Sequence, residues 1–113
     1  LDAYNANPTS MQHALESFAK SSFKRKIVIL GDMFELGEDA PKEHQFIADL
    51  SEQLKFETII LVGNEFSKTK TSDEVLKFTT TLEAQSWFKN QHFDEAEILL
   101  KGSRSMKMEK VVE

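Results

Sequence analysis

Three short aliphatic runs, each ending in glycine, recur along the chain. They are KIVILG at 26–31, TIILVG at 58–63 and EILLKG at 97–102. Strands that are covered on both faces are continuously apolar, whereas half-exposed strands alternate between apolar and polar residues. The runs therefore predict buried strands of a parallel sheet, and VLKFT at 75–79 predicts a shorter strand.

An amphipathic helix is expected before the first of these strands. Its apolar residues follow the spacing i, i+3, i+4, i+7 and i+8: Met11, Ala14, Leu15, Phe18 and Ala19. Asn7 followed by Pro8 predicts where this helix begins. The asparagine oxygen can accept an orphan backbone N–H, and proline has no N–H to satisfy.

Helical patterns also follow the other strands. An incomplete apolar stripe comprises Phe46, Ile47, Leu50 and Leu54. Thr80 and Glu83 form a capping-box pattern ahead of Ala84, Trp87 and Phe88, which are expected in the core. Ser105 is expected to cap a last helix that carries Met108, Val111 and Val112.

Strands that alternate with helices through short connections predict an α/β fold with an open, mostly parallel sheet and helices on both faces. A length of 113 residues, 40% of them hydrophobic, suits one compact domain. In such folds ligands bind beyond the carboxyl ends of the strands. We therefore expect the site after Leu30, Val62 and Leu100, and after a partial first strand at the start of the chain.

Composition narrows the expected partners and location. The net charge is −5, which gives no general attraction to nucleic acids or to acidic membranes. The longest apolar runs, 27–30 and 59–62, are far shorter than the roughly 20 residues that cross a bilayer. The chain has no cysteine, which excludes disulfides and thiol chemistry and favours a cytoplasmic protein over a small secreted one.

The opening stretch LDAYNANPTSM carries more polar groups than a helix start needs. Asn7 is explained by capping, but Asp2, Tyr4 and Asn5 are not. A carboxylate and carboxamides at a strand end could hold sugar hydroxyls or a base edge. On chemistry alone, turn formation is the stronger interpretation.

The stretch LGDMFELG at 30–37 places Asp32 and Glu35 between two glycines directly after a core strand. These carboxylates could bind an ammonium group or a metal, or act as a base, although Gly-Asp is also an ordinary way to leave a strand.

The stretch LLKGSRSM at 99–106 places Lys101, Ser103 and Arg104 between a strand and a helix. Cations, a hydroxyl and free backbone N–H groups there suit an anion or carboxylate site. A glycine turn with solvated cations explains the same residues equally well.

Other polar residues have structural explanations. His13, His44 and His92 lack metal-ligand spacing, so no metal site is predicted, and each is expected at the surface or satisfied inside. The basic triplet at 24–26 is expected to be solvated. The sequence has no G-x-x-x-x-G-K-[ST], G-x-G-x-x-G or G-x-S-x-G motif, so these residues cannot perform phosphoryl transfer alone.

Taken together, DAYNANPTSM, ILGDMFELG with His44 shortly after, and LLKGSRSM resemble the C-terminal domain of the Mur ligases. The resemblance covers essentially the whole chain in order. The D-x-Y-N-A-N-P and K-G-S-R strings are the specific ones. Within the family, the strings are most similar to the member that adds D-alanyl-D-alanine to UDP-N-acetylmuramoyl-tripeptide during peptidoglycan synthesis.

The resemblance implies a Rossmann-like third domain, residues 1–113, that follows a UDP-sugar domain and a central P-loop ATPase domain. ATP would phosphorylate the precursor's carboxylate, and the dipeptide amine would attack the acyl phosphate. ATP and Mg²⁺ would be bound mainly by the central domain. No catalytic residue is expected within this chain, and the fragment is expected to be inactive alone.

The resemblance also implies roles for individual residues. Asp2, Tyr4, Asn5 and Asn7 correspond to the nucleotide side. The amino substrate's carboxylate would meet Lys101, Ser103 and Arg104. Asp32 and Glu35 would face the same cleft and complete the substrate side.

Two other hypotheses stay open on the sequence. One is a non-catalytic flavodoxin-like or receiver-like module that works through protein contacts, although Asp32 and Glu35 only partly imitate a receiver's acidic cluster. The other is a Mur ligase that adds a different amino acid; the N-A-N-P and K-G-S-R strings are the main feature that separates it from the D-alanyl-D-alanine-adding member.

Overall fold

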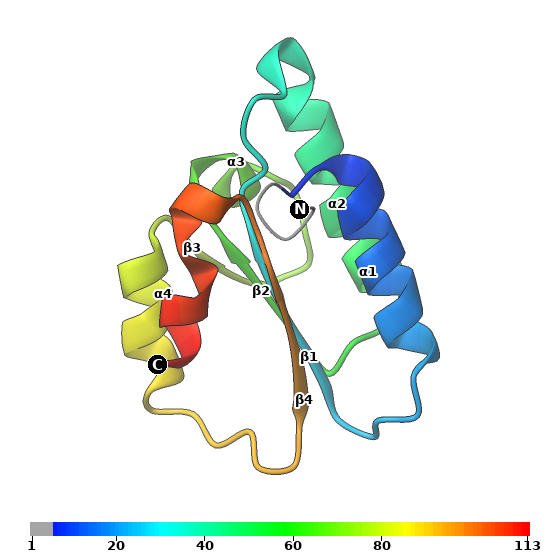
Figure 1. Cartoon of the computed structure of the whole chain (residues 1–113), viewed down its shortest axis with the longest axis vertical. Coiled ribbons are helices and arrows are strands. Elements are labelled where there is room, and N and C mark those ends of the chain that lie inside the picture. The colour runs from blue at the N-terminus through cyan, green and yellow to red at the C-terminus, as the bar shows by residue number, and fades with distance from the viewer. Residues whose placement is uncertain (1–5) are drawn as a thin grey trace.

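The computed structural model describes residues 6–113, and a sheet of four parallel strands lies at its centre (Figure 1). The strands are β1 (Lys26–Gly31), β2 (Thr58–Val62), β3 (Leu76–Phe78) and β4 (Glu97–Lys101). Their order is β3-β2-β1-β4, so β1 pairs with both β2 and β4. The predicted α/β class and parallel sheet are confirmed.

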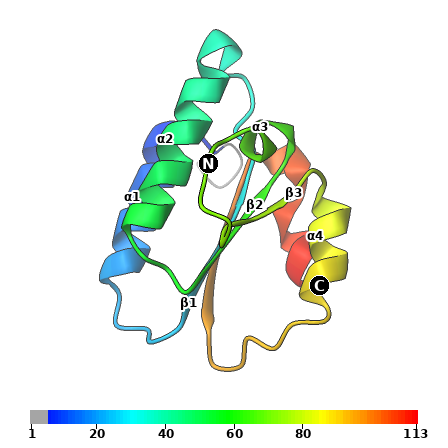
Figure 2. The ribbon, with the colours of Figure 1, turned by 180° about the vertical axis from the view of Figure 1, so that it is seen from behind.

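Helices cover both faces of the sheet (Figures 1 and 2). The α-helices are α1 (Pro8–Lys20), α2 (Ala40–Gln53), α3 (Asn64–Ser67) and α4 (Thr81–Phe88). Short 3₁₀ helices are η2 (Gly37–Asp39), η3 (Arg104–Met106) and η4 (Met108–Val112). Helices α1 and α2 pack on one face, and α4 packs with η4 on the other. In the described part of the chain, no helix has the length and apolarity that crossing a membrane requires.

The continuous apolar character of β1 follows from this double cover. Val28 and Leu30 belong to the core beneath α1 and α2, whereas Ile27 and Ile29 belong to the core beneath α4 and η4. All four side chains are 0% exposed. Alternate residues of a strand point to opposite faces, so both sets are buried only because both faces are covered.

Two of the three helix starts expected from the sequence are confirmed. The Asn7 side chain accepts a hydrogen bond from the backbone N–H of Ser10 at 2.9 Å, and Pro8 is the first residue of α1. The Thr80 hydroxyl accepts from the N–H of Glu83 at 3.1 Å, and Glu83 accepts from the N–H of Thr80 in return. Both are reciprocal capping boxes.

Two details of the expected helices are wrong. Phe46 is 44% exposed, because the buried stripe of α2 runs through His44, Ile47, Ala48 and Ser51. Ser105 caps no helix, because it lies inside η3. Lys107 then has a left-handed backbone (φ 52°), which separates η3 from η4 and prevents one continuous helix.

The basic triplet was expected to be solvated, and two of its three members are only partly exposed and make specific contacts. The Arg25 guanidinium lies 2.6 Å from the Glu57 carboxylate and donates to the carbonyl of Asp94 at 2.8 Å. Lys26 donates to the carbonyl of Ala19 at 2.7 Å. These contacts join segments that enter β1, β2 and β4, which local sequence patterns do not place side by side.

The ion pair gives a prediction about pH. The hydrogen bond from Arg25 lowers the pKa of Glu57 below its ordinary value of 4.5. A depressed pKa means that the pair contributes stability above the unfolded-state value and loses it as the pH falls through the folded-state value. Replacing Glu57 by Gln should therefore lower the melting temperature slightly at neutral pH, and the deficit should shrink below pH 4.5.

Thermal unfolding of both proteins across acidic and neutral pH checks this expectation, with Glu74→Gln as the control at another exposed glutamate. The effect should be small and should fade in high salt, because both partners are partly exposed. A deficit that is the same at every pH would rule out the ion pair as its cause.

Candidate functional site

The loops that follow β1 and β4 are tied together at the carboxyl edge of the sheet. The backbone N–H of Ser103 donates to the carbonyl of Asp32 at 3.0 Å, and the Ser103 hydroxyl accepts from the N–H of Phe34 at 2.8 Å. Ser103 is only 2% exposed. The G-D-M-F and K-G-S-R stretches therefore form one connected structure, at the edge where ligands bind in this class of fold.

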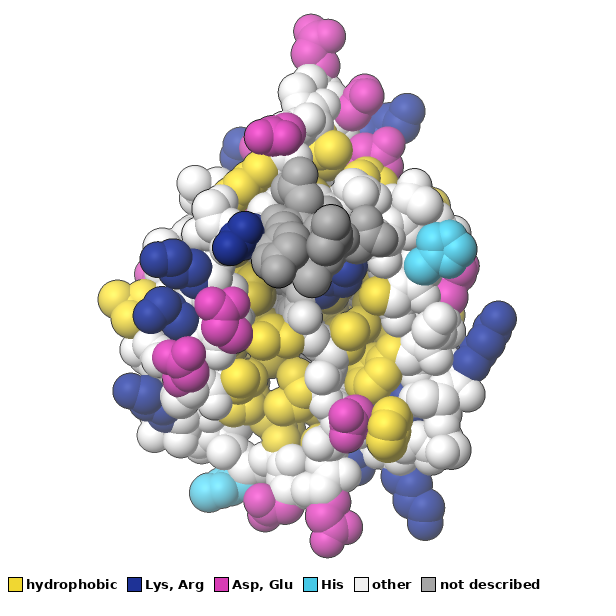
Figure 3. Space-filling model, viewed as in Figure 1, with side chains coloured by type: hydrophobic (Ala, Val, Ile, Leu, Met, Phe, Trp, Pro, Cys, Tyr) yellow, Lys and Arg dark blue, Asp and Glu magenta, His cyan; other side chains and the backbone are white. Residues whose placement is uncertain are grey.

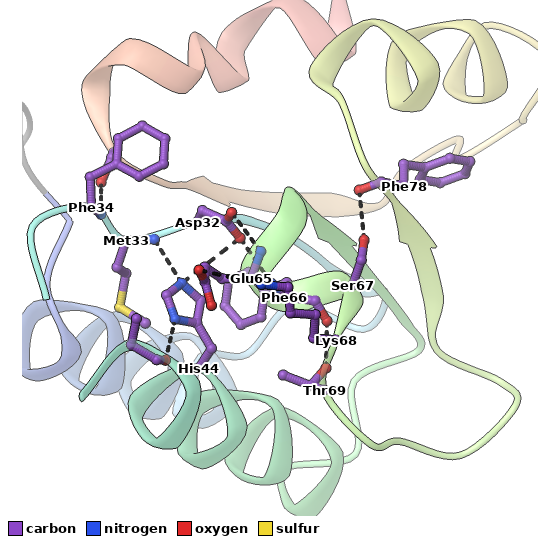
Figure 4. A network of polar contacts seen from close by, with 12 residues as sticks. Asp32, Met33, Phe34, His44, Glu65, Phe66, Ser67, Lys68, Thr69 and Phe78 are labelled. Carbon is purple, nitrogen blue, oxygen red and sulfur yellow. Dashed lines mark hydrogen bonds and ion pairs between the residues drawn. The ribbon is translucent and has the colours of Figure 1, made fainter. Parts of the chain in front are cut away.

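Asp32 links the same edge to the loop after β2 (Figure 4). Its two carboxylate oxygens accept from the N–H of Glu65 at 2.9 Å and the N–H of Phe66 at 3.0 Å. The residue before α3 is Gly63, which has no side chain with which to cap the helix. Asp32, 3% exposed, therefore caps α3 from the neighbouring strand.

Gly63 and Asp32 depend on each other sterically. The backbone of Gly63 has φ 125°, and a Cβ atom added there would lie 2.2 Å from Cγ of Asp32. The carboxylate thus occupies the space that any other residue's Cβ would need. The contacts assign this carboxylate to the backbone of α3, and substrate binding by Asp32 stays a prediction.

His44, on α2, is hydrogen-bonded to the loop that follows β1. Its Nε2 lies 3.0 Å from the backbone nitrogen of Met33, which can only donate, so Nε2 accepts. The proton must then be on Nδ1, which donates to the carbonyl of Ala40 at 2.7 Å. The ring is therefore neutral, and its 3.8 Å approach to Asp32 is not an ion pair. This confirms His44 as a satisfied interior histidine.

A cleft of about 950 Å³ opens beside the connected loops. Its lining residues come from α1, the loop that follows β1, strand β4 and the segment after β4, up to residue 109. They are Ala14, Phe34, Glu35, Leu99, Leu100, Lys101, Gly102, Ser103, Arg104, Ser105, Lys107, Met108 and Glu109. Figure 3 shows an apolar strip along the middle of this face, with basic and acidic side chains beside it. The cleft thus offers both apolar and charged contacts to one ligand.

A second depression, of about 770 Å³, lies at the start of α1. Asn7, Ser10, His13, Glu43 and Lys101 are among its lining residues. Lys101 lines both depressions. The α1 start and the K-G-S-R loop therefore adjoin, although more than 90 residues of chain separate Asn7 from Lys101.

The structure brings most of the predicted site residues to this edge. Lys101, Ser103, Arg104 and Glu35 line the larger cleft, and Asn7 lines the smaller one. Glu35 is exposed and has a left-handed backbone, φ 67°. The remaining nucleotide-side predictions, Asp2, Tyr4 and Asn5, lie outside the described residues.

Phe34, Lys107 and Glu109 line the cleft but were not among the site residues expected from the sequence. Phe34 stands beside Glu35 in the stretch after β1 and is 40% exposed. Lys107 had no distinguishing signal before its left-handed backbone was seen. Within residues 6–113 no three His, Asp or Glu side chains gather as a metal site would need.

Comparison with known proteins identifies relatives along nearly the whole chain. The UDP-N-acetylmuramoyl-tripeptide–D-alanyl-D-alanine ligase of Buchnera aphidicola subsp. Acyrthosiphon pisum is 36% identical over 115 residues, which cover 99% of this chain and 25% of that protein. The ligase of the same name from Treponema pallidum is 34% identical and covers 98% of this chain and 26% of its own length. The chain spans about a quarter of the length of these curated relatives.

Solved structures agree with the fold. One crystal structure of MurF from Acinetobacter baumannii superimposes with a TM-score of 0.79 at 31% identity, covering 97% of this chain and 26% of that one. MurF from Thermotoga maritima, solved in complex with ADP, gives a TM-score of 0.75 over 98% of this chain and 26% of that one; at 22% identity it supports the fold alone.

A family model supplies the assignment. The model described as Mur ligase, glutamate ligase domain, matches residues 1–112. That match leaves a flavodoxin-like or receiver-like module without support. The chain belongs to the Mur ligase family, of which it carries this domain.

Proposed function

We propose that the chain is the C-terminal domain of a three-domain, ATP-dependent ligase that joins D-alanyl-D-alanine to UDP-N-acetylmuramoyl-tripeptide. The observation that carries the proposal is the pair of adjoining depressions that share Lys101. A ligase of this kind must bring a nucleotide and an amino substrate to one reacting carboxylate. Relatives that match nearly the whole chain and bear this activity in their names support the same proposal.

The larger cleft suits the chemistry of the dipeptide. D-alanyl-D-alanine has a carboxylate at one end, an amine at the other and two methyl groups between them. Lys101, Arg104 and Lys107 bring positive charge for the carboxylate, and Glu35 and Glu109 bring negative charge for an ammonium group. Charged groups of both signs in one cleft therefore fit a zwitterionic ligand.

In the proposed reaction, the γ-phosphoryl group of ATP is transferred to the terminal carboxylate of the tripeptide, which gives an acyl phosphate and ADP. The dipeptide nitrogen then attacks the acyl carbon. A C–N bond forms, the C–O bond to phosphate breaks, and the nitrogen loses a proton as phosphate leaves. This domain would orient the amine and close the nucleotide side, which reduces the barrier by positioning.

We assign the residues as follows. The nucleotide side comprises Asp2, Tyr4, Asn5 and Asn7, and the substrate's carboxylate side comprises Lys101, Ser103 and Arg104. Glu35 faces the amine, while Asp32 acts by holding the loops in place. ATP phosphates and Mg²⁺ would be held by the P-loop domain of the longer protein. A cytoplasmic location belongs to the proposal and is favoured by the cysteine-free composition.

The direct test uses the full-length protein that carries this domain. With ATP, UDP-N-acetylmuramoyl-tripeptide and D-alanyl-D-alanine, we expect release of phosphate and a product whose mass has increased by the dipeptide. Residues 1–113 alone should release no phosphate, because the chain has no P-loop.

Single amino acids used in place of the dipeptide serve as the control. If the full-length protein ligates one of them and rejects D-alanyl-D-alanine, it is a Mur ligase of different specificity. Ligase activity from residues 1–113 alone would refute the domain assignment.

A further inference from the structure

Phe34 combines an exposed ring with a fixed backbone. Its side chain is 40% exposed, whereas its N–H is held by the Ser103 hydroxyl at 2.8 Å. The preceding residue, Met33, donates to His44 at 3.0 Å. A single exposed apolar residue is ordinary on a protein surface, but this ring also lines a cleft and stands on an anchored loop, and loops held by a rigid scaffold commonly carry binding residues.

The ring lines the larger cleft together with other apolar groups. Ala14 from α1 and Leu99 from β4 line the same space, and the cations of the K-G-S-R loop lie along it. The serine that holds the Phe34 backbone is itself in that loop. The backbone that carries the ring is therefore tied to the residues assigned to the substrate's carboxylate.

We propose that Phe34 determines specificity for the amino substrate, by placing its ring against an alanine methyl group of the incoming dipeptide. The inference rests on the proposed function and adds a residue that discriminates among dipeptides. One methyl group in an apolar pocket changes kcat/KM by roughly 10- to 200-fold. Discrimination of that size needs a ring carried on a fixed backbone, which the hydrogen bonds of Met33 and Phe34 provide.

The test compares dipeptides in the full-length protein. We would measure kcat/KM for D-alanyl-D-alanine, D-alanyl-glycine and glycyl-D-alanine with the wild type and with Phe34→Ala. The wild type should prefer D-alanyl-D-alanine by roughly 10-fold or more over at least one glycine dipeptide. Phe34→Ala should remove most of that preference, chiefly through a higher KM, and Phe34→Leu should retain much of it.

Phe46→Ala is the matched control. Phe46 is also a phenylalanine on the surface, 44% exposed, but it lies on α2 and does not line the cleft. Its substitution should leave the preference unchanged. Melting temperatures of all variants verify folding, and Phe34→Leu keeps the test valid if the alanine variant unfolds.

Two outcomes would overturn the inference: an unchanged preference in Phe34→Ala, or an equal loss in Phe46→Ala. Failure of the proposed function gives a different result, because the wild type would then reject D-alanyl-D-alanine and accept another amino substrate. In that case the same variants, assayed with the accepted substrate and its analogue lacking one methylene or methyl group, decide the role of Phe34.

Discussion

Replacing Asp32 by alanine is expected to lower the free energy of unfolding by roughly 2 to 4 kcal/mol, because it leaves two backbone donors without their acceptor. The N–H groups of Glu65 and Phe66 both donate to this carboxylate, at 2.9 and 3.0 Å. The N–H of Phe66 is buried, so water cannot readily replace the carboxylate there. Urea unfolding followed by circular dichroism measures the loss.

Two control variants separate the lost acceptors from a general effect of losing a carboxylate. Asp32→Asn keeps one acceptor oxygen and should lose less stability than Asp32→Ala. Asp73→Ala, at an exposed position, should change the free energy of unfolding by no more than about 0.5 kcal/mol. If Asp32→Ala were as stable as the wild type, Asp32 could not be the cap of α3.

Replacing Gly63 by alanine is expected to cost roughly 3 to 5 kcal/mol, because backbone strain and a steric clash act together. The residue has φ 125°, which L side chains rarely adopt, and the new Cβ would lie 2.2 Å from Cγ of Asp32. Relief of the clash would require movement of the carboxylate away from α3. Chemical denaturation again provides the measurement.

Gly37→Ala is the matched control, because Gly37 also has a positive φ, 58°, but a Cβ there would have nothing within 4 Å. Its cost should be only the roughly 1 to 2 kcal/mol of a left-handed residue. Gly63→Ala should also cost less in the Asp32→Ala background, since the clash is then absent. Strictly additive losses in the double variant would exclude the proposed clash.

Local features of the fold were predictable because each depends on a few neighbouring residues. The apolar runs around Val28, Ile60 and Leu99 predicted the strands, and Asn7-Pro8 and Thr80-x-x-Glu83 predicted two helix starts. A run of apolar residues marks a doubly covered strand, and a capping box spans four residues. Both patterns can therefore be recognised in a short stretch of sequence. Phe46 shows the limit of such local patterns. It is apolar yet exposed, while the polar residues His44 and Ser51 on the same helix are buried.

The position of the site was also predictable in outline. Parallel strands end at one edge of the sheet, so G-D-M-F and K-G-S-R were expected at the same edge. That they are neighbours follows from the pairing of β1 with β4, which the sequence did not predict. The function of single side chains at that edge was less predictable. Asp32 suggested a ligand-binding carboxylate, yet both of its oxygens accept from a helix that begins more than 30 residues later.

By itself, the sequence determined the strands, the main helices, the open parallel sheet and the strand-end location of the site. Only the tertiary structure decided that Asp32 caps α3 beside Gly63, that Arg25 pairs with Glu57, and that Phe34 lines the cleft. The physical reason is the range of the interactions. Hydrophobic periodicity and helix caps act between near neighbours, whereas these contacts join residues from different strands and loops and exist only after the sheet has brought them together.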